Sequence, residues 1–239
     1  MITFHIITLF PESLESYLKA SILKRAQEDG HITIKYYNPR DFAIDAKDLT
    51  KMDREPTYSE KRVDDRPYGG GPGMVMEALP VMRAIESALV ESRKSKVGPK
   101  VKIIFFSPAG KQFTNEIADK FKKYTDIILI CGRYEGIDAR VKKAFPMADI
   151  SVGPYVLTGG ELPAMIVIDS IARRIKGVLG DLLSIEESRI ASPDVYTRPE
   201  VIEFKRKKYR VPKILLSGHH AKMDEWRAIK KGKKRSKTF

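Results

Sequence analysis

Cysteine and histidine are scarce in this sequence, which has one cysteine, Cys131, and four histidines in 239 residues. A single cysteine excludes a disulfide within the chain and fits a reducing compartment, so we expect a cytoplasmic protein. The cysteine and the histidines show no metal-ligand spacing, which argues against a structural zinc site. We therefore predict no metal ligands among the side chains.

Long apolar runs are also missing. No run approaches the roughly 20 residues that a membrane-spanning helix needs, so we expect no membrane partner. Residues 1–14 are apolar but lack a basic leader and an A-x-A-like cleavage site. They are therefore predicted to form a strand and not a signal peptide.

Negative charge is in the minority, with a formal net charge of +13 and a pI of about 9.6. Such an excess favours a polyanionic partner, most often nucleic acid, over the alternative of a merely solvated basic surface. Lysine and arginine are concentrated in residues 204–213 and 227–237. The second segment is predicted to be a flexible tail that attracts phosphate without specificity.

Strand and helix patterns alternate across residues 1–177, which is typical of an α/β domain with a parallel sheet. The predicted strands are residues 2–9, 32–37, 100–106, 126–131 and 149–152. The predicted helices are residues 11–26, 76–92, 113–124, 137–144 and 163–175. Residues 178–200 are irregular and are predicted to be a linker, and residues 201–239 are predicted to form a small helical domain with a basic tail.

Three of the predicted strands end in small or kinking residues, at Ser107-Pro108, Gly132 and Gly153. Gly159-Gly160 then opens the helix predicted for residues 163–175. Ligands of open α/β sheets lie beyond the carboxyl ends of the strands, and glycine lets a backbone approach a ligand closely. The loops together predict a pocket lined by main-chain groups, although each loop alone is also explained by ordinary turn glycines.

A long polar loop is predicted for residues 42–66, and loops of this length inside a compact domain are usually functional or mobile. It leads into a glycine-rich segment, residues 66–74, whose sequence is RPYGGGPGM. No GK[ST] follows these glycines, so the segment is not a P-loop.

Eight motifs resemble those of the bacterial tRNA (guanine-N1)-methyltransferases of the SPOUT class. They occur in family order and cover nearly the whole chain, at residues 6–12, 38–41, 63–74, 107–108, 131–138, 155–163, 196–199 and 217–220. Any one of these motifs is weak evidence, whereas the set is very specific.

The resemblance implies a fold and a reaction that periodicity does not suggest. In this family the C-terminal part of the α/β domain forms a trefoil knot, which is a rare exception to the rules for connections. The resemblance implies S-adenosylmethionine as the methyl donor and tRNA as the substrate, methylated on N1 of the guanine 3′ of the anticodon, at position 37. It also implies a homodimer in which each active site takes residues from both subunits.

The family motifs also assign site residues. The resemblance implies cofactor binding by Phe105, Ser107, Pro108, Gly132, Tyr134, Glu135, Gly136, Ser151, Val152, Gly153, Pro154, Tyr155, Val156, Leu157, Gly159, Gly160 and Pro163. It implies RNA binding by Ser188, Arg198, Ser217, His219, His220 and Arg227. Because the family uses a divalent ion, magnesium is expected as a second cofactor, without assigned ligands.

Methyl transfer to guanine N1 requires a base and a cation near the guanine. A methyl sulfonium needs only alignment with the attacking nitrogen, but guanine N1 carries a proton at neutral pH. By resemblance Arg173 holds the guanine, and Asp169, four residues earlier, is placed to orient it; a plain i,i+4 surface pair is the alternative. In the family an aspartate acts as the catalytic base. Its position aligns with Ser188 without a gap and with Glu187 after a gap of one residue. We prefer Glu187, because a hydroxyl does not accept this proton at neutral pH, and Asp194 is a further alternative.

Pro154 departs from the family pattern, which usually has aspartate there. Three hypotheses therefore stay open at this point. The first is the tRNA guanine-N1 methyltransferase, the second is a SPOUT enzyme for another RNA position, and the third is a non-catalytic RNA-binding relative that has lost its base.

Overall fold

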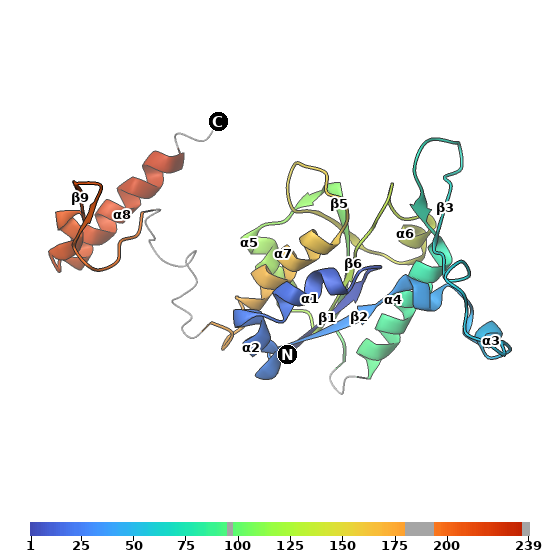
Figure 1. Ribbon diagram of the computed structural model, residues 1–239. Helices are drawn as coiled ribbons and strands as arrows, with labels where there is room; N and C mark the ends of the chain where they lie inside the picture. The colour runs from blue at the N-terminus through green and yellow to red at the C-terminus, as the bar shows by residue number, and fades with distance from the viewer. Residues whose placement is uncertain (95–97, 180–193, 236–239) are drawn as a thin grey trace. The chain divides into compact units, whose positions relative to one another are not determined.

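The computed structural model describes residues 1–94, 98–179 and 194–235 (Figure 1). The chain divides into two compact units, Met1–Gly180 and Asp181–Phe239, each of which is described by itself. Of the predicted linker, residues 178–200, the part from 180 to 193 lies outside the described residues.

The N-terminal unit is built on a five-stranded sheet with the order β2-β1-β6-β5-β7. All pairs of neighbouring strands are parallel, as the alternation of strands and helices predicts. The strands are β1 (Ile2–Ile7), β2 (Ile32–Tyr37), β5 (Val101–Gln112), β6 (Asp126–Ile130) and β7 (Ala148–Ser151). The prediction of a parallel α/β domain is thus confirmed.

Helices cover both faces of the sheet (Figure 1). One face carries α1 (Glu12–Leu18), α2 (Ser21–Glu28), α5 (Asn115–Phe121) and α7 (Glu161–Ala172). The other face carries α4 (Ala78–Arg93) and α6 (Arg140–Ala144). The central strand β6 shows why: Ile127 and Leu129 pack into the first core, and Ile128 and Ile130 into the second. Alternate side chains of a strand point to opposite faces, so a strand buried on both faces is apolar throughout.

The helix predicted for residues 11–26 is in fact two helices, α1 and α2. Ala20 is extended and Ser21 has a positive φ of 49°, which ends the first helix and redirects the chain. The side-chain amide of Gln27 donates a 2.7 Å hydrogen bond to the carbonyl of Leu18, which has no partner within its own helix. The apolar periodicity continues across residues 19–20, so sequence analysis does not detect the break between α1 and α2.

Strand β5 extends beyond its predicted end at residue 106. The register with β7 shifts between Phe106 and Lys111, so residues 107–110 bulge out of the ladder before pairing resumes. A Cβ on Gly110 would lie 2.7 Å from the backbone of Asp149 and Ile150. The bulge carries the predicted Ser107-Pro108 loop, and only glycine permits the close return to β7.

The segment between β2 and α4 is less irregular than the sequence suggests. It contains a 3-10 helix, η1 (Pro39–Phe42), which is capped by the Asn38 side chain, and a short helix, α3 (Ala46–Leu49). Strands β3 (Asp64–Asp65) and β4 (Val75–Met76) pair antiparallel and close the glycine-rich segment into a loop.

The described part of the C-terminal unit contains β8 (Val201–Phe204), β9 (Lys207–Arg210), a 3-10 helix, η4 (Lys213–Leu216), and α8 (His220–Arg235). The prediction of helices alone was therefore wrong for residues 201–210, which form an antiparallel hairpin. Its two-residue turn, Lys205-Arg206, has positive φ at both positions without glycine or asparagine. Sequence analysis relies on those residue types to find such turns.

Candidate active site

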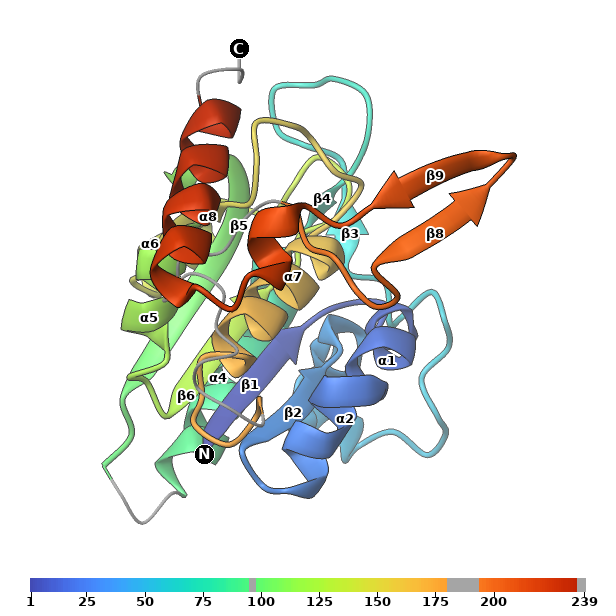
Figure 2. The ribbon, with the colours of Figure 1, turned by 90° about the vertical axis from the view of Figure 1, so that its left-hand side faces the viewer.

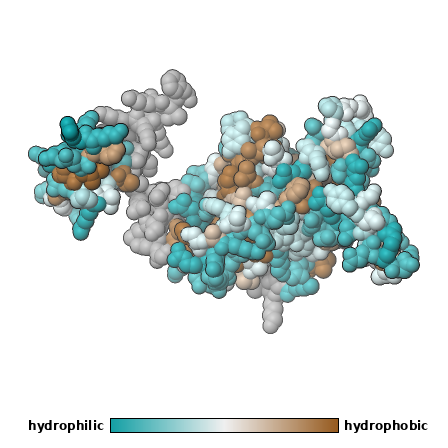
Figure 3. Space-filling model, viewed as in Figure 1, coloured by the Kyte–Doolittle hydropathy of each residue, from teal (hydrophilic) through white to brown (hydrophobic). Residues whose placement is uncertain are grey.

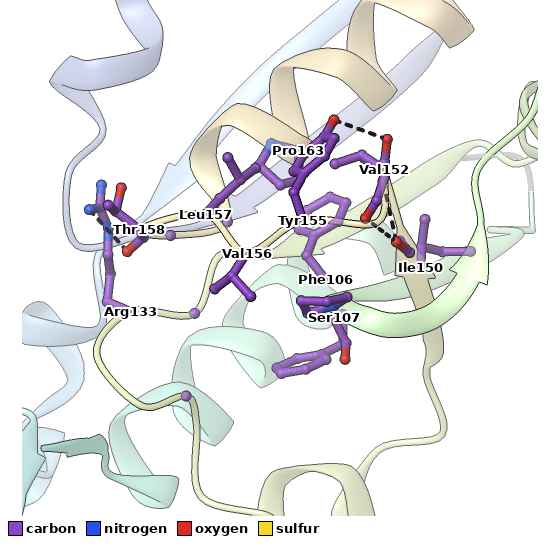
Figure 4. Close-up of a pocket in the computed structure, with 18 of the residues that line it drawn as sticks. Phe106, Ser107, Arg133, Ile150, Val152, Tyr155, Val156, Leu157, Thr158 and Pro163 are labelled. Atoms are coloured by element: carbon purple, nitrogen blue, oxygen red, sulfur yellow. Dashed lines mark hydrogen bonds between the residues drawn. The ribbon is translucent and has the colours of Figure 1, made fainter. Parts of the chain in front are cut away.

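A cavity of about 200 Å³ lies beside the bulge of β5 and beyond the carboxyl ends of β6 and β7. Three segments that are distant in the sequence line it, as Figure 4 shows. They are the bulge of β5, the loop after β6 and the segment from β7 into α7. This is the convergence of three loops that the sequence predicts, and it follows the general rule for ligand sites in open α/β sheets.

The lining includes every residue predicted to bind the cofactor except Pro154. Four further residues line the cavity without having been predicted, namely Phe106, Arg133, Ile150 and Thr158. Each of them directly adjoins a predicted residue in the sequence, and this adjacency was the available signal. Arg133 and Thr158 lie at one end of the cavity, and Ile150 and Val152 at the other (Figure 4).

The chain that enters α7 passes directly against the end of β6. The amide of Gly160 donates a 3.0 Å hydrogen bond to the carbonyl of Gly132. A Cβ on Gly160 would lie 2.4 Å from the Cα of Cys131, closer than any side chain permits. The neighbouring Cys131 is buried, and this burial raises the pKa of its thiol well above the usual value. The thiol is therefore un-ionised at neutral pH and is not a nucleophile.

Local contacts shape the segment after β7. The ring of Tyr155 lies where a Cβ of Gly153 would be, 2.2 Å from its ideal position. The Tyr155 hydroxyl donates a 3.2 Å hydrogen bond to the carbonyl of Val152, and the Ser151 hydroxyl donates one of 3.0 Å to the carbonyl of Gly153. Glycine at 153 thus allows the tyrosine to fold back over the loop.

A buried carboxylate, Glu161, contacts both the end of β1 and the loop after β6. Its Oε1 accepts a 2.8 Å hydrogen bond from the Thr8 hydroxyl, and its Oε2 lies 3.0 Å from Nε of Arg133. The angles at the second contact do not satisfy a hydrogen bond, so we describe it as an ion pair. The Arg133 guanidinium also lies 4.7 Å from the centre of the Phe10 ring, which holds it by a cation–π contact.

The glycine-rich segment, residues 66–74, contacts the loop after β6, which lines the cavity. The amide of Glu135 donates to the carbonyl of Met74, and the amide of Met76 donates to that of Gly136, both at 3.0 Å. Gly73 lies against the Glu135 side chain, 2.6 Å from the position its Cβ would take. The loop between β3 and β4 is therefore anchored to a segment predicted to hold the cofactor.

Arg173 and Asp169 do not form the predicted ion pair in the described part of the structure. Oδ2 of Asp169 instead accepts a 2.9 Å hydrogen bond from the Tyr17 hydroxyl, which raises the pKa of Tyr17. Arg173 directly follows α7, and its Nε is buried without a hydrogen-bond partner among the described residues. Burying a guanidinium nitrogen without a hydrogen bond costs free energy, so this donor is left unsatisfied by the described residues.

The predicted base, Glu187, lies outside the described residues, as do Ser188 and the other residues of 180–193. Of the candidates for this role, only Asp194 is described, and it is half-buried. The choice between Glu187 and its alternatives therefore stays a prediction.

The predicted RNA-binding residues of the C-terminal unit gather mostly at the start of α8. The Ser217 hydroxyl donates to the carbonyl of Ile214 at 2.8 Å and accepts from the amide of His219 at 3.3 Å. His219 and His220 are exposed, whereas Arg227 is half-buried and paired with Asp224 at 2.7 Å. Arg198 is exposed and lies before β8.

Within residues 1–94, 98–179 and 194–235, no group of three or more His, Cys, Asp or Glu is placed to hold a metal ion. No helix in these same ranges is long and apolar enough to cross a membrane.

Comparison with known proteins gives consistent matches. The family described as "tRNA (Guanine-1)-methyltransferase TrmD" matches residues 2–238. A tRNA (guanine-N(1)-)-methyltransferase of Dictyoglomus turgidum is 41% identical over 238 residues, which cover 97% of this chain and 86% of the relative. One of Clostridioides difficile is 42% identical and covers 94% and 90% of the two chains. The crystal structure of the tRNA (m1G37) methyltransferase from Aquifex aeolicus matches with a TM-score of 0.70 and 33% identity, covering 95% of this chain and 88% of that one.

Proposed function

Because the chain belongs to the tRNA (guanine-1)-methyltransferase family and is such an enzyme, we propose that it methylates N1 of the guanine at position 37 of tRNA. The methyl donor in this proposal is S-adenosylmethionine. The observation that carries it is the cavity, which is lined by residues of three segments, within 105–108, 132–136 and 150–163, that overlap the family motifs at 107–108, 131–138 and 155–163. The solved relative whose title names m1G37 supports the choice of position 37.

The lining suits S-adenosylmethionine in its chemistry. When bound, the cofactor supplies a methyl group on a positively charged sulfonium. Val156, Leu157 and Pro163 present apolar surface for an adenine ring, while the glycines at 132, 136 and 159 leave main-chain groups accessible for its polar edge. Glu135 adds a carboxylate to the same lining, and a carboxylate favours a cation.

The guanine needs help to become a nucleophile. In this proposal a linker carboxylate, Glu187 by preference over Ser188 or Asp194, accepts the N1 proton. Arg173 donates to guanine O6, where negative charge develops, and its buried Nε without a partner among the described residues supports this role. Asp169 orients Arg173 in this proposal through a contact that it does not make in the described structure, where its Oδ2 accepts from Tyr17.

Among the described residues no group of three or more His, Cys, Asp or Glu side chains is placed to hold a magnesium ion. We therefore assign it no ligands and no step in the reaction.

The finer features of the family are part of the same proposal. A trefoil knot in residues 1–177 is supported by the close crossing of Gly160 against Cys131. A homodimer is supported by exposed apolar side chains beside the cavity, with Val156 84% exposed, Leu162 53% and Ile166 44%. Figure 3 shows hydrophobic surface over the loop that precedes α7. The C-terminal unit is proposed to bind the tRNA.

Single-turnover methylation of two tRNA transcripts, with and without the guanine at position 37, tests this function. We expect N1-methylguanine in the first transcript alone. Equal product from both transcripts indicates a SPOUT enzyme for another RNA position. No product from either transcript contradicts the proposal and favours the hypothesis of a non-catalytic RNA-binding relative.

A further inference from the structure

The hairpin formed by β8 and β9 stands as a ribbon of only two strands. Its cross-strand pairs run from Val201 opposite Arg210 to Phe204 opposite Lys207. Figure 2 shows it extending away from α8 within the C-terminal unit. An isolated two-stranded hairpin is marginally stable in water, so a ribbon that projects in this way is expected to gain from a partner.

One face of the ribbon is apolar and aromatic. Directly opposed residues and residues two apart share a face, which places Ile202, Phe204, Lys207 and Tyr209 together. Ile202 is 55% exposed, Phe204 61% and Tyr209 46%. Hydrophobic surface surrounded by hydrophilic surface is visible where Figure 1 labels β9 (Figure 3). Exposed rings gathered on one face mark a surface for binding and not an incidental apolar residue.

Positive charge surrounds these rings. Residues 201–210 contain five cations, Lys205, Arg206, Lys207, Lys208 and Arg210, and one anion, Glu203. Nζ of Lys205 lies 5.5 Å from the centre of the Phe204 ring, and Nζ of Lys207 lies 5.6 Å from that of Tyr209. The two cations of the turn, Lys205 and Arg206, are at the tip of the ribbon, where a long backbone can pass across them.

A partner that fits this surface carries many negative charges and flat rings at once. RNA meets both requirements, because its phosphates attract lysine and arginine and any unpaired base stacks on an exposed aromatic ring. A membrane or an acidic protein supplies negative charge but no succession of flat rings. The combination of charge and aromatic face therefore selects RNA.

We propose that the β8–β9 hairpin is an RNA-binding surface of its own, in addition to the cavity and to the residues around the start of α8. Lys205 and Arg206 bind backbone phosphates, and Phe204 and Tyr209 stack on bases that are not paired. This proposal rests on the proposed function in one respect, since the RNA it binds is the tRNA substrate.

Two double variants of the full chain separate the charge from the rings. Phe204→Ala with Tyr209→Ala is expected to weaken tRNA binding roughly tenfold or more, because each stacked base is lost. Lys205→Gln with Arg206→Gln is expected to lower the slope of log Kd against log salt by about 1.5, which corresponds to two phosphate contacts. Fluorescence anisotropy with labelled tRNA, measured at several salt concentrations, gives both quantities.

Matched controls exclude loss of fold and general charge effects. Phe204→Tyr with Tyr209→Phe keeps both rings and is expected to bind tRNA as the unmodified chain does. Lys19→Gln with Lys24→Gln removes two exposed cations, one directly after α1 and one in α2, and is expected to leave the salt slope unchanged. Binding of S-adenosylmethionine, followed by calorimetry, is expected to be equal in all variants.

The outcomes are distinguishable from failure of the proposed function. If the unmodified chain methylates tRNA while the hairpin variants bind tRNA with unchanged affinity and salt slope, the hairpin proposal is wrong. If those variants bind tRNA normally but change the oligomeric state in light scattering, the face packs against a second copy of the chain, which also overturns it. If the unmodified chain binds no cofactor and makes no product, the proposed function itself fails.

Discussion

The Thr8 hydroxyl donates a 2.8 Å hydrogen bond to Oε1 of Glu161, and this contact joins the end of β1 to the first turn of α7. The other carboxylate oxygen of Glu161 lies 3.0 Å from Nε of Arg133, which belongs to the loop after β6. One buried side chain thus connects three segments, two of which line the cavity.

Glu161→Gln is expected to lower the free energy of unfolding by about 2 kcal/mol, because it leaves the half-buried Arg133 without its counter-charge. We also expect weaker binding of S-adenosylmethionine, since Arg133, which lines the cavity, loses its ion pair with Glu161. Urea denaturation and calorimetry measure the two effects. The control is Glu28→Gln, which breaks an exposed pair with Lys24 and is expected to cost less than about 1 kcal/mol. Equal losses in both variants would contradict the structural role of Glu161.

Gly160→Ala is expected to destabilise the N-terminal unit by roughly 2 kcal/mol or more, because the new methyl group has no room beside Cys131. The change is also expected to abolish measurable binding of S-adenosylmethionine by displacing the chain that enters α7. Gly98→Ala is the matched control, because nothing lies within 4 Å of its Cβ position. Thermal unfolding and calorimetry of both variants decide the matter, and a Gly160→Ala protein that behaves like the control would refute the close crossing.

Arg173→Gln is expected to lower the single-turnover rate of methylation about 100-fold, the usual effect of removing one donor to developing negative charge. Affinity for S-adenosylmethionine is expected to stay unchanged, because Arg173 does not line the cavity. Arg93→Gln, at the exposed end of α4, serves as the control. A normal rate in the Arg173 variant, or an equal loss in both, would remove Arg173 from the proposed mechanism.

His5 is expected to titrate below pH 6.5, because its burial lowers the pKa of the imidazole more than the hydrogen bond to Asp126 raises it. The folded protein thus holds the neutral form. Its contribution to stability is fully present above pH 6.5 and is lost as the pH falls through the lower pKa of the folded state. NMR titration of the four histidines measures this directly, with His5→Gln to assign the signal. A His5 signal that titrates at or above pH 6.5 would show that the pair with Asp126 dominates.

The chemistry of the cavity could be predicted to a large extent from the sequence. Apolar runs such as residues 127–130 are long enough for a strand buried on both faces, and a parallel sheet then places the loops that follow its strands at one edge. Glycines at 132, 153 and 160 indicate close approaches, and the structure shows one of backbone at Gly160, against Cys131, and one of a side chain at Gly153, against the ring of Tyr155. The resemblance supplied the identities of most lining residues: of those it implied, only Pro154 does not line the cavity, and it missed Phe106, Arg133, Ile150 and Thr158.

The sequence could not predict which side chains meet across the fold. Spacing alone pairs Asp169 with Arg173 on one helix, but the packing of α1 against α7 brings Tyr17 to Asp169 instead. Thr8 and Glu161 are likewise 153 positions apart, and no local pattern relates them. Period and residue type are local properties, and by themselves they determined a parallel α/β sheet with glycine loops at one edge. The partner of each polar side chain depends on which helices cover which face, so only the tertiary structure decided the contacts that hold the cavity in shape.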